Sequence, residues 1–215
     1  MAGKTKISTY DKIIDKSIQL FNKHGVFNVS VQRIAAALKI SPGNVTYHFK
    51  KKNDILHAIL KRVEDSMEAT RAQVEQLDAD VKKHYEFMIS IHRELWNYRF
   101  IFNNMVYLNS EDKTLGKRIL RINEASKKQL HELAELSVQR GWLEPIQPPN
   151  STKLLTENLW YIWLSWLRMS QLEAKSSGAL ISFATNHFFS LMSPHWNKKL
   201  GAGILEYMKA DLAKS

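Results

Sequence analysis

The sequence predicts an all-α protein with a small N-terminal helix-turn-helix domain and a larger C-terminal helical domain. Three observations support this fold class. Apolar residues recur at the spacing of amphipathic helices along much of the chain, and no stretch shows the alternation typical of a β-strand. Only 8 Gly and 5 Pro interrupt the 215 residues. With 44% hydrophobic residues, a chain of this length can bury a sizeable core.

The positive charge is concentrated near the N-terminus. The net charge is +10, and residues 1–65 hold 12 basic and 5 acidic side chains, against 19 and 16 in residues 66–215. A localised positive field favours a polyanionic partner, because each Lys or Arg placed near a phosphate releases counterions. Composition alone leaves both a nucleic acid and an anionic membrane open.

Composition also bears on the cellular setting. The chain has no Cys, so disulfides, thiolate metal sites and Cys nucleophiles are excluded. Residues 1–10 lack the apolar core of a secretion signal, and the longest apolar stretch, 159–169, is shorter than the roughly 20 residues that span a bilayer. We therefore expect a cytoplasmic protein.

The first 50 residues predict three short helices. The expected ranges are 9–24, 31–38 and 42–49. Gly25 can take the left-handed conformation that closes the first helix, and Ser30 is a good N-cap for the second. Ser41 followed by Pro42 indicates the start of the third, because Pro at the first helical position loses no hydrogen bond. Two or three residues separate the last two helices, which predicts a helix-turn-helix.

Longer helical patterns follow in the rest of the chain. The expected ranges are 53–77, 81–108, 113–140, 152–174, 178–192 and 199–213. Turn-forming residues separate them. We therefore expect a helix-turn-helix domain over residues 1–52 and a second helical domain over residues 53–215. The first part of the helix 53–77 packs on the first domain and links the two.

Two segments of the N-terminal region resemble a known family. The segments IIDKSIQLFNKHGVF, from Ile13, and IAAALKISPGNVTYHFKKKNDIL, from Ile34, are similar to the N-terminal domain of TetR regulators. The resemblance covers about the first 60 residues. It rests on coupled positions, namely Leu20, Phe21, Gly25, Ile34, Ala35, Ser41, Gly43, Tyr47, Phe49 and Lys52. It implies a homodimeric transcription regulator that binds a palindromic DNA operator and acts as a repressor released by a small apolar or amphipathic effector.

The third predicted helix carries the candidate DNA-reading residues. Its first residues, Ser41, Pro42 and Gly43, present backbone amides and a small side chain to a groove or phosphate. The Asn44 amide can pair with adenine, and Thr46 can reach a base edge or a thymine methyl group. A polar and cationic rim suited to phosphates completes the set, consisting of Arg33, Tyr47, His48, Lys50, Lys51 and Lys52.

Several of these residues have other interpretations. A run of three lysines, considered alone, is more typical of a solvated helix end than of a binding site. Phe49 is expected in the core against Phe21 and Ile34 rather than on DNA. Two positions depart from the family pattern: Thr46 replaces the usual Tyr, and Lys39 replaces the usual turn Gly, so a residue with a Cβ must adopt the turn.

The C-terminal domain is rich in aromatic residues, which are candidates for an effector pocket. The predicted pocket residues are Trp96, Phe100, Tyr107, Trp160 and Trp163. Ligand pockets are mostly apolar, and the resemblance implies that some pocket exists in this domain. For any one of these aromatic residues, ordinary packing in the core or at a dimer interface is the alternative.

The segment 154–172 is apolar almost all round, so it should be buried both in its own domain and against another surface. In similar proteins the last long helices of each subunit form a four-helix dimer interface, which here implies the helices 152–174 and 178–192. The predicted interface residues are Leu159, Trp166, Phe183 and His187.

Catalysis and metal binding have no support in the sequence. His131 and Glu135 have the spacing of a ligand pair, yet no third ligand completes a site. No phosphate-binding Gly-rich loop, GxSxG motif or HExxH motif occurs. We therefore predict no catalytic residue, metal or cofactor and no membrane partner. The rival hypotheses are a helical enzyme or small-molecule carrier that uses the aromatic domain, and a peripheral membrane protein that uses the lysines and tryptophans together.

Overall fold

The computed structural model describes residues 8–78, 80–173 and 175–212, which form two compact units. The first unit contains the residues up to Ser66 together with Asn97–Leu120, and the second contains Met67–Trp96 and the residues from Arg121 onward. The described residues are helical apart from turns, loops and one isolated bridge, so the all-α prediction is confirmed. The expected domain limits, 1–52 and 53–215, stay a prediction.

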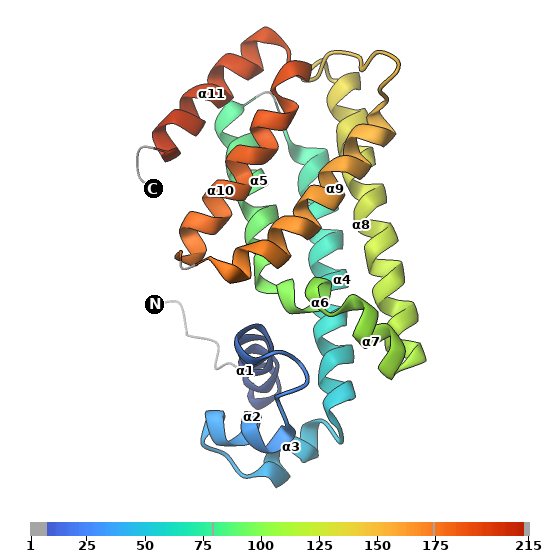
Figure 1. Ribbon diagram of the computed structural model, residues 1–215, viewed down its shortest axis with the longest axis vertical. Helices are drawn as coiled ribbons and strands as arrows, with labels where there is room; N and C mark the ends of the chain where they lie inside the picture. The colour runs from blue at the N-terminus through green and yellow to red at the C-terminus, as the bar shows by residue number, and fades with distance from the viewer. Residues whose placement is uncertain (1–7, 79, 174, 213–215) are drawn as a thin grey trace. The chain divides into compact units, whose positions relative to one another are not determined.

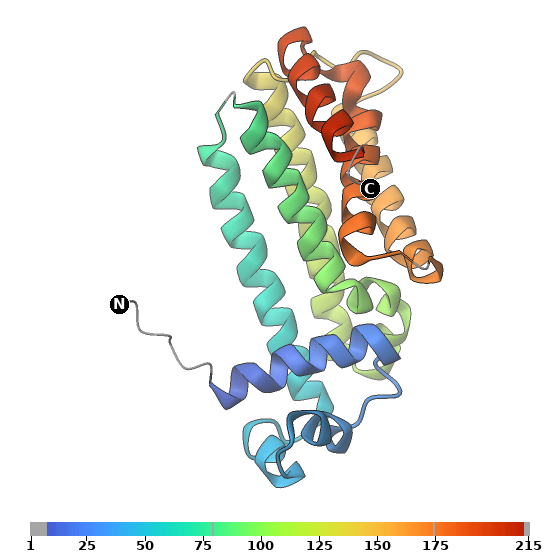
Figure 2. The same cartoon turned by 90° about the vertical axis from the view of Figure 1, so that its left-hand side faces the viewer.

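The first unit begins with three short helices and the first part of a long one (Figure 2). Their bounds are α1 Thr9–His24, α2 Val31–Leu38, α3 Pro42–His48 and α4 Lys52–Gln76. Ser8, Ser30 and Ser41 cap the first three, each accepting a hydrogen bond from the backbone N–H three residues later. Gly25 ends α1 at a φ of 77°, a left-handed angle that favours glycine.

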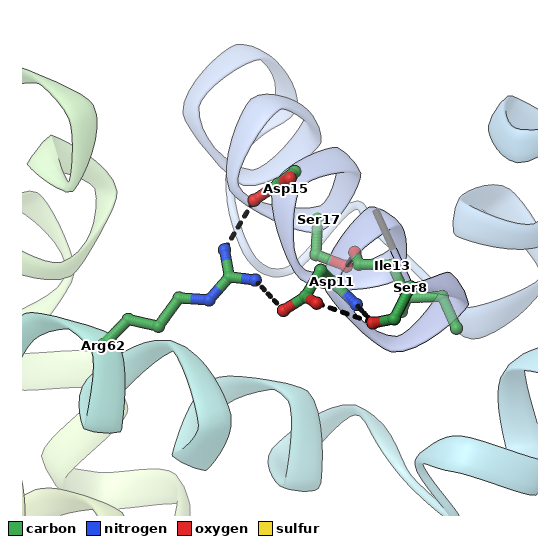
Figure 3. A network of polar contacts seen from close by, with 6 residues as sticks. All are labelled: Ser8, Asp11, Ile13, Asp15, Ser17 and Arg62. Atoms are coloured by element: carbon green, nitrogen blue, oxygen red, sulfur yellow. Dashed lines mark hydrogen bonds and ion pairs between the residues drawn. The ribbon is translucent and has the colours of Figure 1, made fainter. Parts of the chain in front are cut away.

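Arg62 on α4 ties α1 to this unit, as Figure 3 shows. Its guanidinium donates to Asp11 at 2.7 Å and also to Asp15, both on α1. The Ser8 hydroxyl bonds the other Asp11 oxygen at 2.6 Å. The hydrogen bonds from Ser8 and then from Arg62 lower the pKa of Asp11. Both helices also bury apolar side chains, since Ile13 on α1 and Ile59 on α4 are fully buried.

The predicted helix over 81–108 is wrong as a single element. The structure has α5 Val81–Asn97, α6 Arg99–Asn103 and α7 Met105–Glu111 instead. At the break between α5 and α6, the Asn22 side chain of α1 makes hydrogen bonds that the backbone of a continuous helix would otherwise make. Its amide donates to the Asn97 carbonyl at 2.7 Å, and its oxygen accepts from the Phe100 backbone N–H at 3.1 Å. A side chain 75 residues away therefore stabilises the interruption.

Helix α8, Lys113–Gln139, contributes to both units. In the first unit, Arg118 donates to both carboxylate oxygens of Glu64 on α4 at 2.7 Å and to the His57 carbonyl at 2.8 Å. In the second unit, Arg140 at the end of α8 donates to the Leu77 carbonyl at 2.7 Å. Arg118 thus ties α8 to α4 in the first unit, and Arg140, directly after α8, binds the end of α4 through the Glu75 carbonyl at 3.2 Å in the second.

The remaining helices belong to the second unit (Figure 1). They are α9 Thr152–Met169, α10 Ser177–Met192 and α11 Lys198–Leu212. Helix α10 packs beside both α9 and α11. The expected helix 152–174 ends at Met169, where a short 3-10 turn, Ser170–Leu172, follows. The core of this unit contains Trp160, Leu159 and Phe189.

Candidate nucleic-acid interface

Helix α3 is positioned by the two residues that precede and open it. The Ser41 hydroxyl accepts from the Asn44 backbone N–H at 3.2 Å, and Pro42 occupies the first helical position. Both features follow from the local sequence, and both predictions are confirmed. The helix has one fully buried side chain, Val45, which anchors it to the core of the first unit.

The rest of α3 faces outward. The exposed predicted residues at its start and along its length are Ser41, Pro42, Gly43, Asn44, Thr46 and Tyr47. Tyr47 is 84% exposed although its ring is large and apolar, so it contributes little to the core of the chain. His48 is half-buried, and the Thr46 hydroxyl donates to the Gly43 carbonyl at 3.1 Å. Helix α3 therefore exposes a polar face with one aromatic side chain, Tyr47, to solvent.

Among the described residues, no neighbour packs so closely on Gly43 that it must be a glycine. A Cβ built on it would meet the Ser41 hydroxyl at 3.8 Å, which is ordinary van der Waals contact. It lies within a regular helix, where glycine is less favourable than alanine by about 1 kcal/mol. The start of α3 is therefore exposed and carries a minimal side chain at this position.

The turn between α2 and α3 is made by Lys39 in the left-handed conformation, with φ 56° and ψ 41°. Its backbone N–H bonds the Ala36 carbonyl at 3.1 Å, and the Ile40 N–H bonds the Ala35 carbonyl at 3.1 Å. These two bonds satisfy backbone carbonyl groups at the end of α2. A glycine in the left-handed conformation usually permits the same bonds at the end of a helix. The expectation that a residue with a Cβ must adopt this turn is confirmed.

The predicted cationic rim divides into two kinds of residue. Lys50 and Lys51 are exposed. Lys52 is half-buried, and its ammonium donates to the Val26 carbonyl at 2.9 Å, while the Arg33 guanidinium donates to the Asn28 carbonyl at 3.0 Å. Lys52 and Arg33 thus hold the chain's own backbone, a role that sequence reasoning missed. Their contact with phosphate stays a prediction.

Phe49 is buried, as expected, but its ring stacks on Tyr10, with 4.7 Å between ring centroids. The expected neighbour Phe21 instead contacts Phe100 at 5.2 Å. Tyr10 also lies 6.3 Å from the ring of His48. The aromatic side chain that supports the end of α3 therefore comes from the first turn of α1, and sequence reasoning did not identify it.

The five predicted pocket residues are divided between the two units, and their role in a pocket stays a prediction. Trp96, Trp160 and Trp163 are buried in the second unit. Phe100 and Tyr107 lie in the first unit, because the chain leaves the second unit after Trp96. The ring of Tyr107 contacts Phe27, with 3.4 Å between centroids. The set therefore cannot line one cavity within either unit.

The second unit has a cavity of about 60 Å³ that contains none of those five residues in its lining. Its walls are mainly apolar and include Met88, Leu159 and Phe188 from three helices, together with Trp142 and Trp196 from loop segments. The two tryptophans lie outside regular helices, so helical periodicity gave no signal that would place them at a cavity.

Two of the four predicted dimer-interface residues are buried and two are exposed. Leu159 and Trp166 are 2% and 8% exposed and belong to the core of the second unit. Phe183 and His187 are exposed on α10, and their rings contact each other at 4.0 Å. Further apolar side chains are exposed on the same two helices, namely Tyr161, Ile162 and Met169 on α9 and Leu191 on α10.

The described residues were compared with the requirements of a metal site and of a membrane-spanning helix. Among them, no group of three or more His, Cys, Asp or Glu side chains is placed to hold a metal ion. Within the same residues, no helix combines the length and the apolar character needed to cross a bilayer.

Comparisons with known proteins identify the family of the chain. A family profile described as "Bacterial regulatory proteins, tetR family" matches residues 13–59, and one described as "Bacterial transcriptional repressor" matches residues 56–202. Among curated proteins, "Probable HTH-type transcriptional regulator YttP" of Bacillus subtilis is 26% identical over 60% of this chain and 63% of its own length. An HTH-type transcriptional regulator of Staphylococcus aureus (strain bovine RF122 / ET3-1) is 32% identical over 40% of this chain and 44% of its own length. The matches thus span about half the length of these relatives.

Solved structures show the same fold. A TetR-family transcriptional regulator from Marinobacter aquaeolei VT8 superimposes with a TM-score of 0.81 at 24% identity, covering 95% of this chain and 99% of the other. SmeT, the repressor of the Stenotrophomonas maltophilia multidrug efflux pump SmeDEF, gives 0.61 at 20% identity, covering 90% and 93%. The second family profile alone spans more than half of the chain. The chain therefore belongs to the TetR family of bacterial transcriptional regulators, which are not enzymes.

Proposed function

We propose that the chain is a homodimeric transcriptional repressor that places α3 in the major groove of a palindromic operator. The observation that carries the proposal is the outward face of α3. There the described part of the chain leaves Asn44 and Tyr47 exposed and would leave room for a Cβ on Gly43. Asn44 and Thr46 contact base edges, while Tyr47, Lys50 and Lys51 contact phosphates. The family membership supports DNA as the polyanion that the basic N-terminal region requires.

The second copy binds at the outer face of α9 and α10. Tyr161, Ile162 and Met169 on α9 recur at helical spacing and are 40% to 61% exposed, and Phe183 and Leu191 on α10 are 40% and 42% exposed. Two adjacent helices with such faces form a four-helix interface when a second copy pairs with them. A two-fold dimer then presents two α3 helices to half-sites separated by about 34–36 Å or somewhat more.

Repression is relieved by a small apolar or amphipathic effector bound in the second unit. The largely apolar cavity beside Met88 and Phe188 supports this, as ligand sites are usually concave and mostly hydrophobic. One solved relative is described as a complex of SmeT with triclosan. The effector releases DNA because it binds more tightly to the conformation in which the half-site spacing no longer fits the operator.

The first test uses Gly43 and a matched control elsewhere in the chain. An operator is selected from random DNA with the purified chain, and its affinity is measured for Gly43→Ala and Gly178→Ala. Both glycines lie at the second helical position after a capping serine, and a Cβ at Gly178 would meet only the Ser176 hydroxyl at 3.9 Å. We expect at least a tenfold loss of affinity for Gly43→Ala and none for Gly178→Ala. Equal affinities would contradict a close approach of DNA to α3.

The second test uses the salt dependence of operator binding. Each phosphate contact that is lost reduces the slope of log affinity against log salt by about 0.9. We expect the double variant Lys50→Ala/Lys51→Ala to reduce the slope by several units in the dimer. The control variant Lys198→Ala/Lys199→Ala removes two exposed lysines from α11 and should leave it unchanged. Binding of the unaltered chain to anionic vesicles with no affinity for any selected DNA would favour the membrane alternative.

A further inference from the structure

Among the described residues, three buried polar atoms of the second unit lack hydrogen-bond partners and belong to two indole rings and the imidazole ring that contacts both of them. They are Nε2 of His92 on α5 and the indole Nε1 atoms of Trp163 and Trp166 on α9. The side chains are 0%, 5% and 8% exposed. The His92 ring stands nearly perpendicular to both indoles, with centroid distances of 5.0 Å and 5.9 Å. We call these three residues the polar cluster.

The protonation of His92 follows from its other nitrogen. Nδ1 lies 2.8 Å from the Met88 carbonyl oxygen, which can only accept a hydrogen bond. Nδ1 therefore carries the ring proton and donates it, which leaves Nε2 as an acceptor. Burial lowers the pKa of His92 to about 4, so the ring is neutral near pH 7. Thr185, which is 3.1 Å from Nδ1, donates to the Ile181 carbonyl and does not supply Nε2.

The polar cluster thus offers one acceptor and two donors. Buried polar groups are normally paired, and leaving them unpaired is costly. Trp160, which is also buried, has such a partner, because its indole N–H donates to the Asn123 side-chain oxygen at 3.1 Å. A hydroxyl group matches the cluster, because it donates one hydrogen bond and accepts two. A carboxylate has no proton for His92, and an ammonium has no lone pair for the indoles.

The polar cluster adjoins the apolar cavity through shared side chains. Phe188 lines the cavity, and its ring lies 6.0 Å from that of His92 and 5.7 Å from that of Trp163. Met88 lines the cavity too, and its carbonyl binds His92. The unbranched Met88 side chain can change its rotamer to admit a ligand between the cavity and the cluster. Leu159, one helical turn before Trp163 on α9, also lines the cavity.

We propose that the effector is an uncharged, largely apolar alcohol or phenol. Its hydroxyl group donates to Nε2 of His92 while accepting from the indole N–H groups of Trp163 and Trp166. Its apolar body occupies the cavity, which measures about 60 Å³ without a ligand and widens on binding as the Met88 side chain rotates. This proposal specifies the chemical class of the ligand and therefore rests on the effector-responsive function proposed above. A water molecule has the same hydrogen-bonding pattern, so the test separates a ligand hydroxyl from a resident water.

The test compares three probes of nearly the same shape by calorimetry on the full chain without DNA. They are 4-butylphenol, 4-butylanisole, which lacks the donor, and butylbenzene, which lacks the oxygen. We expect 4-butylphenol to bind at least tenfold more tightly than the other two. His92→Phe should reduce that preference to less than threefold, whereas the control Trp160→Phe, whose indole is already paired, should retain it. Equal affinities of the three probes, or no binding of any, would overturn the proposal.

A second measurement needs no altered chain, in case His92→Phe fails to fold. In the unaltered protein labelled with ¹⁵N-tryptophan, the indole resonances of Trp163 and Trp166 should move downfield with 4-butylphenol and not with butylbenzene. Resonances that respond alike to both probes would overturn the proposal and indicate that a water remains bound to the cluster. Because these experiments contain no DNA, their failure is distinguishable from failure of operator binding, which is measured without any probe.

Discussion

Among single side chains, His92 of the second unit has a pKa that burial shifts strongly. It is fully buried, and its neighbours Trp163, Trp166 and Phe188 are uncharged rings. Burial lowers its pKa from 6.5 to about 4, because the imidazolium would lose its hydration in this environment. Between these two values the unfolded chain takes up a proton that the folded chain does not.

We therefore expect the free energy of unfolding to fall as the pH is lowered from 6.5 towards 4. The contribution of His92 has a slope of up to about 1.4 kcal/mol per pH unit within this window and is complete above it. Urea unfolding at pH 7 and pH 5 measures the fall, and His92→Gln should lose most of it. His195→Gln serves as the control, and an equal loss in both variants would exclude His92 as the cause.

Lys39 stores backbone strain at the turn before α3. Its φ of 56° costs a residue with a Cβ roughly 1 kcal/mol relative to glycine. We expect Lys39→Gly to raise the free energy of unfolding by about 0.5 kcal/mol, after the entropy of glycine in the unfolded chain is deducted. Lys39→Ala removes the same charge but keeps the Cβ, so it should give no gain. Thermal unfolding of the two variants side by side tests this, and a gain for Ala would point to charge instead.

Residue-level prediction from sequence succeeded where the partner is close in the chain. The caps at Ser30 and Ser41 depend on a backbone N–H three residues away, which any helix start supplies. The Lys52 contact with the Val26 carbonyl spans 26 residues and needs the folded unit to exist. A local sequence pattern does not identify such a distant partner. The same phosphate contact was therefore predicted for Lys50, Lys51 and Lys52, although their environments differ.

Among the helices, the break between α5 and α6 shows how tertiary contacts override a periodic sequence. Residues 81–108 contain no Gly or Pro, so the sequence predicted one helix. The Asn22 amide replaces helical partners at Asn97 and Phe100, and the start of α6 follows from it. Most other helix boundaries lie close to the predicted ones, because capping serines, Gly25 or Pro42 mark several of them. The end of α9 is an exception, at Met169 instead of residue 174.

Removing the Asn22 side chain tests this account. Asn22→Ala leaves the Asn97 carbonyl and the Phe100 N–H without their partner, at a cost of about 2 kcal/mol. Urea unfolding should show that loss. Asn28→Ala is the matched control, because it removes a single exposed bond to the His24 carbonyl and should cost less than about 1 kcal/mol. Equal losses would mean that the break is stable without Asn22.

For the whole molecule, the main prediction concerns self-association through α9 and α10. Phe183→Arg places a charge in the proposed interface, where burial without a partner is unfavourable. We expect this variant to elute as a monomer of 24.9 kDa in size exclusion with light scattering, while the unaltered chain elutes at twice that mass. Val106→Arg on α7, where the side chain is 85% exposed, should remain dimeric. A monomeric unaltered chain would contradict the proposed dimer.

The sequence predicted the α3 region better than the second unit, and the reason is physical. A helix-turn-helix packs mostly neighbours in sequence, so its residues can be placed from spacing alone. The cavity gathers Met88, Trp142 and Phe188 from distant segments, and which aromatic residues meet there depends on the packing of several helices. Phe100 and Tyr107 were assigned to the pocket with Trp96 because all three fall in one predicted helix, yet the chain enters the other unit after Trp96.

Helix α9 has two faces of different exposure within 18 residues. Trp160 and Trp163 point into the second unit, whereas Tyr161 and Ile162 between them are exposed. A saturation library of this helix should therefore give phenotypes that alternate with a period of 3.6 residues. Inward substitutions would yield regulators that ignore the inducing compound, and outward ones would yield regulators that no longer occupy the promoter. A bacterial reporter strain would distinguish these two classes by whether the gene stays off or stays on.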